Sequence, residues 1–239
     1  MDESAYLRAF EAHLNKRNIQ IEPAASKRCG LYFYLIHVKN QSMNLTRYDS
    51  PADAVDYHLL DALAINQALS NEPIESLIDV GSGAGVPGVL LNCISTDMRL
   101  CVLDSVKKKM DFVASALEAL QLGGSSAVSA RAEDLGHDPA HREQYDCATA
   151  RALGTQAYCL ELCAPFVKTG GGIALLRSDE DLIHANNQYA ETLGCLREKV
   201  LNYQLPGREK AFRIEIYRKN APTADKYPRK PGKIKKRPL

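Results

Sequence analysis

The sequence lacks the features of membrane and secreted proteins. No apolar run approaches the roughly 18 residues needed to cross a lipid bilayer, and charged side chains interrupt the first twenty residues, where a secretory signal would be apolar. The seven cysteines are scattered, mostly inside apolar stretches, which suits buried, reduced thiols better than a disulfide framework. We therefore expect a cytoplasmic protein with no membrane partner.

Metal-binding patterns are also missing. Cys159 and Cys163 have helical spacing but no evident third partner, which favours core packing over an iron–sulfur site. Pro139 separates His137 from His141, which favours an exposed loop over a zinc site. The sequence therefore predicts no metal centre.

Charge is distributed unevenly along the 239 residues. The net charge is only +1, yet residues 218–239 carry nine cations against one acid, so the rest of the chain is mildly acidic. A basic end on an acidic body indicates a nucleic-acid or acidic-membrane partner. From charge alone, a solvated tail that only maintains solubility is an equally good interpretation.

Two patterns of hydrophobicity divide the chain. Residues 1–70 have apolar side chains at helical spacing, and Pro23 and Gly30 are expected to mark the gap after the first helix. Beyond residue 72, short apolar strands alternate with amphipathic helices, which predicts a parallel sheet with right-handed crossovers. Strands are expected near 75–80, 99–104, 125–130, 145–150, 171–177, 196–204 and 211–218, and helices near 87–95, 107–122, 155–165 and 179–192.

The last two predicted strands have no helical pattern between them, so one of them should run antiparallel at the sheet edge. The predicted fold is a doubly wound, Rossmann-like α/β domain over residues 73–219, with a helical extension over residues 1–72 and a basic tail over residues 220–239. The tail is rich in proline and lysine, and we expect it to be an extended, flexible arm. The alternative is a structural clasp in which Tyr227 packs on the body.

A glycine-rich turn follows the first predicted strand. Residues 81–88 read Gly-Ser-Gly-Ala-Gly-Val-Pro-Gly and come directly after Asp79 and Val80. Glycines allow a tight turn and a close approach of the backbone to a ligand, and the amides of the following helix can face a polar group. Asp104 lies nineteen residues past Gly85, a spacing that suits hydrogen bonds to ribose hydroxyls. The turn therefore predicts a nucleoside-containing cofactor.

Two cofactors fit this turn. Gly83 to Gly88 satisfies the dinucleotide pattern G-x-G-x-x-G, so an NAD enzyme is a rival interpretation. S-adenosylmethionine is favoured because the glycines begin directly after an Asp-bearing strand end, a pattern that resembles motif I of methyltransferases. The chain also has no room for a second nucleotide-binding half plus a substrate domain.

Later segments are expected at the same edge of the sheet. Ala132 and Glu133 follow the third strand, where an amide and a carboxylate could contact adenine, although Glu133 also suits a helix N-terminus. Arg151 ends the fourth strand and could bind the methionine carboxylate, an RNA phosphate or an acid of the same pocket. His58 and Asp61 lie one helical turn apart and are expected to hydrogen-bond each other where the extension docks, the alternative being that they line the RNA site.

Together these segments resemble the GidB (RsmG) family of small-subunit ribosomal RNA guanine-N7 methyltransferases over nearly the whole chain. The matching segments are 43–46 (Met-Asn-Leu-Thr), His58 and Asp61, 79–88, 103–105, 131–133, 149–151 and the closing Tyr-Pro-Arg-Lys-Pro-Gly at 227–232. The resemblance implies contacts with S-adenosylmethionine at Gly81, Val86, Asp104, Ala132, Glu133 and Arg151, to which the glycine pattern adds Asp79, Gly83 and Gly85.

The resemblance also implies small-subunit ribosomal RNA as the partner, and we expect the protein to be a monomer. RNA contacts are expected at Arg177, Arg213, Arg229, Lys230, Lys233, Lys235 and Lys236. The chain departs from the family at two places. Many members have lysine where this chain has Arg177, and their arginine before the last strand aligns with Phe212, with Arg213 one place on.

The implied reaction requires no general base. Guanine N7 carries an in-plane lone pair and no proton at neutral pH, so the enzyme has mainly to orient the reacting atoms. The sequence agrees, since it contains neither the Asn/Asp-Pro-Pro-Tyr/Phe segment of amino-group methyltransferases nor a Pro-Cys nucleophile. No catalytic residue is therefore assigned. The alternatives are a methyltransferase of another RNA base or of protein, and a non-catalytic RNA-binding module on the same fold.

Overall fold

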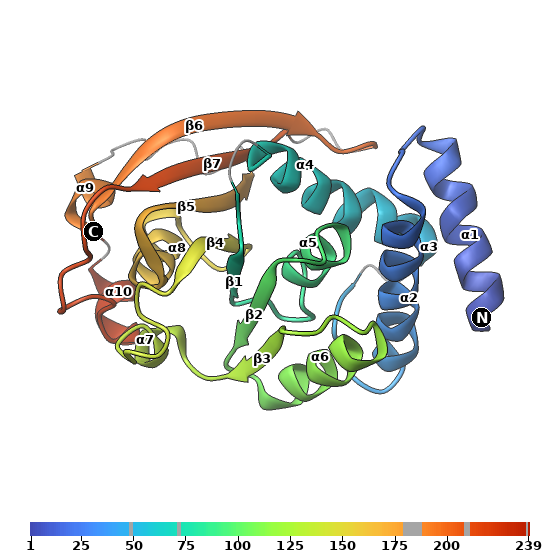
Figure 1. Ribbon diagram of the computed structural model, residues 1–239, viewed down its shortest axis with the longest axis horizontal. Helices are drawn as coiled ribbons and strands as arrows, with labels where there is room; N and C mark the ends of the chain where they lie inside the picture. Colours follow the sequence, from blue (N-terminus) through green and yellow to red (C-terminus); the bar gives the residue numbers. More distant parts are fainter. Residues whose placement is uncertain (48–49, 71–72, 179–187, 208–210, 238) are drawn as a thin grey trace.

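The structure is a computed structural model that describes residues 1–47, 50–70, 73–178, 188–207, 211–237 and 239. A seven-stranded sheet crosses the molecule in the order β3-β2-β1-β4-β5-β7-β6 (Figure 1). Its strands are β1 (Ser76–Val80), β2 (Arg99–Asp104), β3 (Ser126–Ser129), β4 (Tyr145–Arg151), β5 (Val167–Ser178), β6 (Cys195–Gln204) and β7 (Ala211–Lys219).

The first five strands are parallel, and β7 runs antiparallel to both β5 and β6. The order of connection reverses between β1 and β4. At such a reversal the crossover helices lie on opposite faces, which leaves a crevice at the carboxyl ends of the strands. This edge of the sheet is therefore the expected ligand site.

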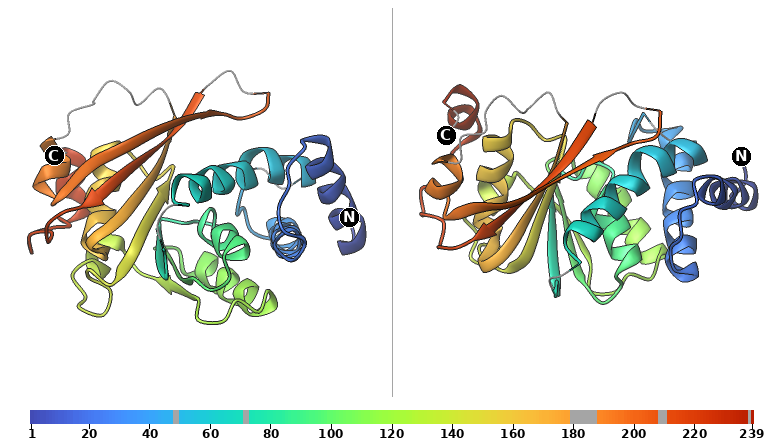
Figure 2. Two further views of the ribbon diagram at one scale, coloured as in Figure 1. Left: turned by 45° about the horizontal axis from the view of Figure 1, so that its top comes forward. Right: turned by 90° about the horizontal axis from the view of Figure 1, so that it is seen from above.

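Helices cover both faces of the sheet (Figure 2). On one face, α4 (Leu60–Ala68), α5 (Gly88–Ile94) and α6 (Lys107–Ala119) lie next to the sheet. Outside them lie α2 (Pro23–Asn40), α3 (Pro51–Asp53), the π-helix η1 (Ala54–Leu59) and, outermost, α1 (Glu3–Lys16). The other face packs against α7 (Ala132–Leu135), α8 (Gln156–Cys163), the 3-10 helix η2 (Ala164–Phe166), α9 (Gln188–Thr192) and α10 (Pro231–Lys236). None of the described helices is long and apolar enough to span a bilayer.

The predicted alternation of strands and helices is confirmed. Each predicted strand is present, and the antiparallel pairing at the sheet edge is formed by β7 with its two neighbours. The helix expected near 179–192 is described only from Gln188, and residues 179–187 lie outside the described residues.

The helical extension shares one apolar core with the sheet. Within it, Pro23 opens α2, as a residue that ends the preceding gap should, but Gly30 lies in the middle of α2. A Cβ at Gly30 would lie 2.9 Å from Leu7 Cδ2 and 3.1 Å from Phe10 Cδ1 of α1. The prediction that Gly30 marks a gap is therefore wrong, because this glycine allows two helices to pack closely instead of breaking one.

The basic tail is docked as a clasp. Tyr227 and Ile234 are buried in the same apolar cluster as α8, and Arg142 donates a 2.9 Å hydrogen bond to the Tyr227 carbonyl. Arg229 forms a paired contact with Glu161 of α8, through Nε at 2.8 Å and Nη2 at 2.5 Å. The prediction of a flexible arm is therefore wrong for the described residues. The prediction rested on the lysine and proline content of the tail, and it took no account of the buried Tyr227 and Ile234 or of the pairing of Arg229 with Glu161.

Candidate active site

The glycine loop stands at the carboxyl end of β1 in the expected tight turn. Gly81, Gly83 and Gly85 have positive φ values of 70°, 60° and 79°, which L side chains rarely adopt. Gly83 has open space where a Cβ would stand, with only the Lys109 ammonium nearby at 3.8 Å. A Cβ on Gly85, in contrast, would overlap the Tyr32 hydroxyl. The loop thus faces the crevice on one side and the extension on the other.

The extension supports this loop directly. The buried Tyr32 of α2 donates its hydroxyl hydrogen bond to the Ala84 carbonyl, and its ring stacks on Phe112 of α6 with centroids 6.4 Å apart. Burial raises the pKa of the Tyr32 hydroxyl, so it remains a donor. Sequence reasoning missed this residue, because nothing local to Tyr32 indicates a partner fifty-two positions away.

Asp79 lies beneath the loop and is completely buried. Its Oδ2 accepts hydrogen bonds from the Ser82 hydroxyl and, at 2.8 Å, from the Gly88 amide, but its Oδ1 has no partner among the described residues. Burial raises the pKa of this carboxyl to about 6, although the two hydrogen bonds and the charge of Arg151 oppose that shift. A buried carboxylate oxygen without a donor is costly for the protein, and here it leaves one unfilled acceptor beneath the glycine loop.

Asp104 ends β2 on the other side of the loop. Its carboxylate accepts 2.9 Å hydrogen bonds from the Gly83 and Val106 amides. Both oxygens still have lone pairs to offer, and the side chain is only half-buried. The acid therefore fixes the loop and also presents acceptors to the crevice.

A small pocket continues from Asp104 towards α7. Ala132 and the buried Glu133 line it together with Leu103, and Tyr158 lies 3.4 Å from a Glu133 carboxylate oxygen. Leu153 closes the pocket against Gly81, whose added Cβ would overlap the leucine side chain. The predicted residues Gly81, Asp104, Ala132 and Glu133 are thus brought together, with apolar walls and two carboxylates. Val86 lies in the core on the other side of the loop.

Arg151 reaches the extension rather than open solvent. Its Nη1 lies 2.9 Å from Asp61 Oδ2 and 3.2 Å from the Tyr57 carbonyl, and its Nη2 lies 2.9 Å from His58 Nδ1. Tyr203 of β6 donates a 2.6 Å hydrogen bond to the other Asp61 oxygen. Of the three partners predicted for Arg151, the structure shows the acid, Asp61. Both His58 and Asp61 contact Arg151, and these contacts dock the extension on β4.

Three of the predicted RNA-binding arginines are engaged inside the protein. Arg177 is buried and donates to the Gly154 carbonyl. Arg213 is buried and pairs with Glu215 at 2.6 Å, and Arg229 is held by Glu161. By contrast, Lys230, Lys233 and Lys236 are exposed, and the side chain of Lys235 lies outside the described set. Contact of these residues with RNA stays a prediction.

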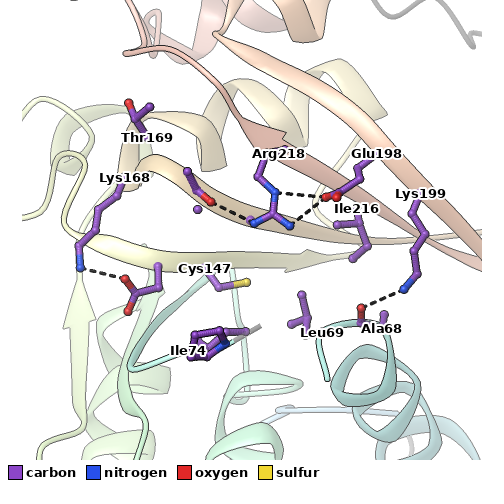
Figure 3. A pocket seen from close by; sticks show the side chains of 15 residues that line it. Ala68, Leu69, Ile74, Cys147, Lys168, Thr169, Glu198, Lys199, Ile216 and Arg218 are labelled. Atoms are coloured by element: carbon purple, nitrogen blue, oxygen red, sulfur yellow. Dashed lines mark hydrogen bonds and ion pairs between the residues drawn. The ribbon is translucent and has the colours of Figure 1, made fainter. Parts of the chain in front are cut away.

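A second cavity, of about 530 Å³, opens at the amino ends of the parallel strands, on the side of the sheet away from the glycine loop (Figure 3). Its cations are matched by protein acceptors: Lys168 lies 2.9 Å from Asp146, Arg218 lies 3.0 Å from Glu198, and Lys199 donates to a carbonyl at the end of α4. Because this cavity begins where β4 and β5 start, it lies far along the strands from the glycine loop. This cavity shares no lining residue with the pocket beside the glycine loop.

The histidine pair considered above has ordinary partners. His137 contacts the Pro228 carbonyl at 2.8 Å, and His141 contacts the Tyr145 hydroxyl at 2.7 Å. Among the described residues, no group of three or more histidines, cysteines and acids is arranged to hold a metal ion.

A family model described as rRNA small subunit methyltransferase G matches residues 26–210. The chain belongs to the GidB family. Ribosomal RNA small subunit methyltransferase G of Pelotomaculum thermopropionicum is 36% identical over 211 residues, covering 87% of this chain and 88% of the relative. The enzyme of the same name from Symbiobacterium thermophilum is 34% identical over 247 residues and covers both chains fully.

Solved structures agree with this fold at low sequence identity. A mutant of MtNAS has a TM-score of 0.53 and 17% identity, covering 92% of this chain and 83% of its own. Geranyl diphosphate C-methyltransferase from Streptomyces coelicolor A3(2), solved with S-adenosyl-L-homocysteine, has a TM-score of 0.50 and 10% identity over 66% of this chain and 79% of its own. Like its family, this GidB chain uses S-adenosylmethionine.

The residues at the loop fit this cofactor. The open side of Gly83 admits a close ligand, the Asp79 oxygen lacks a donor, and the half-buried Asp104 can accept from ribose hydroxyls. Glu133 and the Ala132 amide stand at the far end of the same pocket, where an adenine amino group and ring nitrogen can be recognised.

Replacing Asp104 with alanine is expected to weaken S-adenosylmethionine binding by roughly 1.5–3 kcal/mol, the range for hydrogen bonds to a charged group. The fold should survive, because the side chain is at the ligand edge and only half-buried. Titration calorimetry measures the loss. Asp104→Asn retains an acceptor for the Gly83 amide and should therefore lose less cofactor affinity than the alanine variant. Native affinity in the alanine variant would refute the assignment.

Proposed function

We propose that this GidB-family chain transfers a methyl group from S-adenosylmethionine to N7 of a guanine in small-subunit ribosomal RNA, by in-line attack without a general base. The observation that carries the proposal is the glycine loop flanked by Asp79 and Asp104 at the carboxyl edge, in a chain of this family. We propose Gly81, Gly83, Gly85, Ala132 and Glu133 as the further members of the cofactor site. Val86, in the core behind the loop, and Arg151, paired with Asp61, are proposed to support the site without touching the cofactor.

The protein's contribution is orientation. The cofactor, when bound, supplies an electrophilic methyl group on sulfur. Asp104 and Glu133 would fix the position of the nucleoside end of the cofactor. The Tyr32 hydroxyl holds the glycine loop that faces it. Holding reactants in attack geometry is worth several kcal/mol of barrier without any proton transfer. Since guanine N7 has no proton to remove, no side chain needs a catalytic pKa.

Arg151 acts in this proposal as a positioning residue. Its contacts with Asp61 and His58 tie the carboxyl end of β4 to the extension. His58 in turn contacts the Thr46 hydroxyl at 3.1 Å, so the same cluster includes Thr46. The exposed Lys230, Lys233 and Lys236 are proposed RNA contacts, whereas the internal partners of Arg177, Arg213 and Arg229 argue against that role for the arginines.

The position of methylation can be tested chemically. Methylation at N7 gives a positively charged guanine whose ring opens in alkali, so that aniline cleaves the RNA there. Small-subunit ribosomal RNA treated with the enzyme and S-adenosylmethionine should gain a single aniline-sensitive guanine. RNA treated without the cofactor is the control. Methyl incorporation without such cleavage would refute the N7 assignment and leave a methyltransferase of another position.

A further inference from the structure

The predicted arginines have partners inside the protein, and the exposed lysines of the tail do not by themselves form a surface that leads RNA to the cofactor. A surface suited to RNA should combine unpaired cations with exposed aromatic or apolar groups, and it should adjoin the cofactor edge. This inference rests on the proposed function, since it concerns how the same site receives its RNA.

The N-terminus of α6 carries an unusual charge for its position. Lys107, Lys108 and Lys109 occupy the first turn, which contains no acid and has no side-chain cap. Cations at a helix N-terminus oppose the helix dipole, so these three charges do not stabilise α6 through that dipole. Lys107 pairs with Asp111 at 2.6 Å, whereas Lys108 and Lys109 have no acidic partner in the described part of the chain.

A groove of about 830 Å³ separates this part of α6 from α2, a size in the range of ligand sites. Tyr34 and Phe112 line it from opposite helices, and both rings are half-buried. Val38 is 45% exposed, which is high for an apolar side chain in a helix that otherwise packs on the core. Lys39 and Lys108 stand on the two sides, and both are exposed.

The groove adjoins the cofactor edge. Lys109, next to the groove-lining Lys108, brings its ammonium group to 3.8 Å from the position of a Cβ on Gly83. On the inner side, Phe112 stacks on Tyr32, which holds the glycine loop through the Ala84 carbonyl. An RNA strand that leaves a nucleotide at the cofactor can therefore continue into the groove.

We propose that this groove between α2 and α6 binds a single-stranded segment of the ribosomal RNA next to the target guanine. Lys39 and Lys108 contact phosphates, and Tyr34 and Phe112 contact bases. Aromatic side chains flanked by cations suit single-stranded RNA, whose unpaired bases can stack on rings. The cavity in Figure 3 lacks this character, because its cations are matched by acids and carbonyls.

The test compares two double variants that each remove two positive charges. Lys39→Ala/Lys108→Ala changes the groove, and Lys168→Ala/Lys199→Ala changes the opposite edge of the sheet. Binding of a short single-stranded RNA from the small subunit is measured by fluorescence anisotropy as a function of salt. Each lost phosphate contact lowers the slope of log affinity against log salt by about 0.7, so the groove variant should lose about 1.4 in slope and roughly 25-fold in affinity at 0.1 M salt. The control should stay near the native value.

A third variant, Tyr34→Leu, tests the bases separately. It should weaken binding roughly five- to hundred-fold with an unchanged salt slope, since stacking carries no charge. S-adenosylmethionine affinity, measured by calorimetry, should be native in all these variants. Equal losses of RNA affinity in the two double variants, or no loss of RNA affinity in the groove variant, would overturn the proposal. Absence of methyl transfer to ribosomal RNA by the native protein would instead refute the proposed function, whatever the groove variants show.

Discussion

Arg229→Ala is expected to destabilise the protein by about 3 kcal/mol, because it leaves the fully buried Glu161 carboxylate without its counter-ion. For a chain of this size such a loss lowers the melting temperature by roughly 6–12 °C. The Arg229 amide still donates to Glu161 in the variant, but one neutral donor cannot replace a paired guanidinium. Thermal unfolding followed by circular dichroism measures the effect.

The neighbouring Lys230 provides a matched control. It is exposed, so Lys230→Ala removes the same charge from the same segment without opening a buried pair and should melt near the native temperature. A second variant, Arg229→Leu with Glu161→Leu, removes both charges and should recover part of the loss. A native melting temperature for Arg229→Ala would show that the tail is not clasped in solution.

Asp79→Asn is expected to raise the stability of the protein, whereas Arg229→Ala lowers it, and to weaken cofactor binding. With a pKa of about 6 in the folded protein, against an ordinary value of 3.8, the ionised carboxylate is disfavoured by about 3 kcal/mol at pH 8. Asparagine keeps an acceptor for Ser82 and Gly88 but carries no charge to bury. The variant should therefore be more stable than the native protein at pH 8, by up to that amount.

The pH dependence identifies the cause. The folded protein binds the Asp79 proton more tightly than the unfolded chain, so this group's contribution to the unfolding free energy of the native protein falls as pH rises from about 4 through 6. The advantage of the asparagine variant should accordingly shrink below pH 6 and largely vanish near pH 4. Asp97→Asn, at an exposed acid, should show no such profile.

Cofactor affinity gives the second readout for Asp79. If the free Oδ1 accepts a hydrogen bond from the bound cofactor, Asp79→Asn should bind S-adenosylmethionine roughly ten- to hundred-fold more weakly in calorimetry. A gain in stability together with a loss of affinity would mean that the desolvated carboxylate is maintained for binding. Native affinity would remove Asp79 from the cofactor site.

The sheet could be predicted from sequence because its signals are local. The central strands contain short apolar runs, and the lack of a helical pattern between residues 204 and 211 is enough to predict an antiparallel pair. The glycine loop and Asp104 were found for the same reason, since a tight turn after a strand requires glycine within a few positions. Parallel strands then bring their carboxyl ends together without any knowledge of side-chain contacts.

The errors come from contacts between distant residues. Gly30 looked like a helix breaker, because its sequence neighbours do not reveal that α1 presses on it. Arg229 looked like a free cation, because its partner Glu161 lies 68 positions earlier in an apolar helix. Charge patterning describes surfaces well but cannot distinguish a cation that meets RNA from one that meets a buried acid.

The hydrogen bond from Tyr32 to Ala84 limits how this enzyme can be rebuilt. The methyltransferase sheet looks like a module that could be fused to another recognition element, but its loop has the phenol of α2 as an outside support. Arg151 likewise finds its counter-ion in the extension. A chimera that keeps only the residues after 72 would lose the Tyr32 hydrogen bond that supports the glycine loop. It would also leave Arg151 without Asp61. Retargeting by fusion would therefore have to include α2, η1 and α4, and change only the surfaces that these helices expose to solvent.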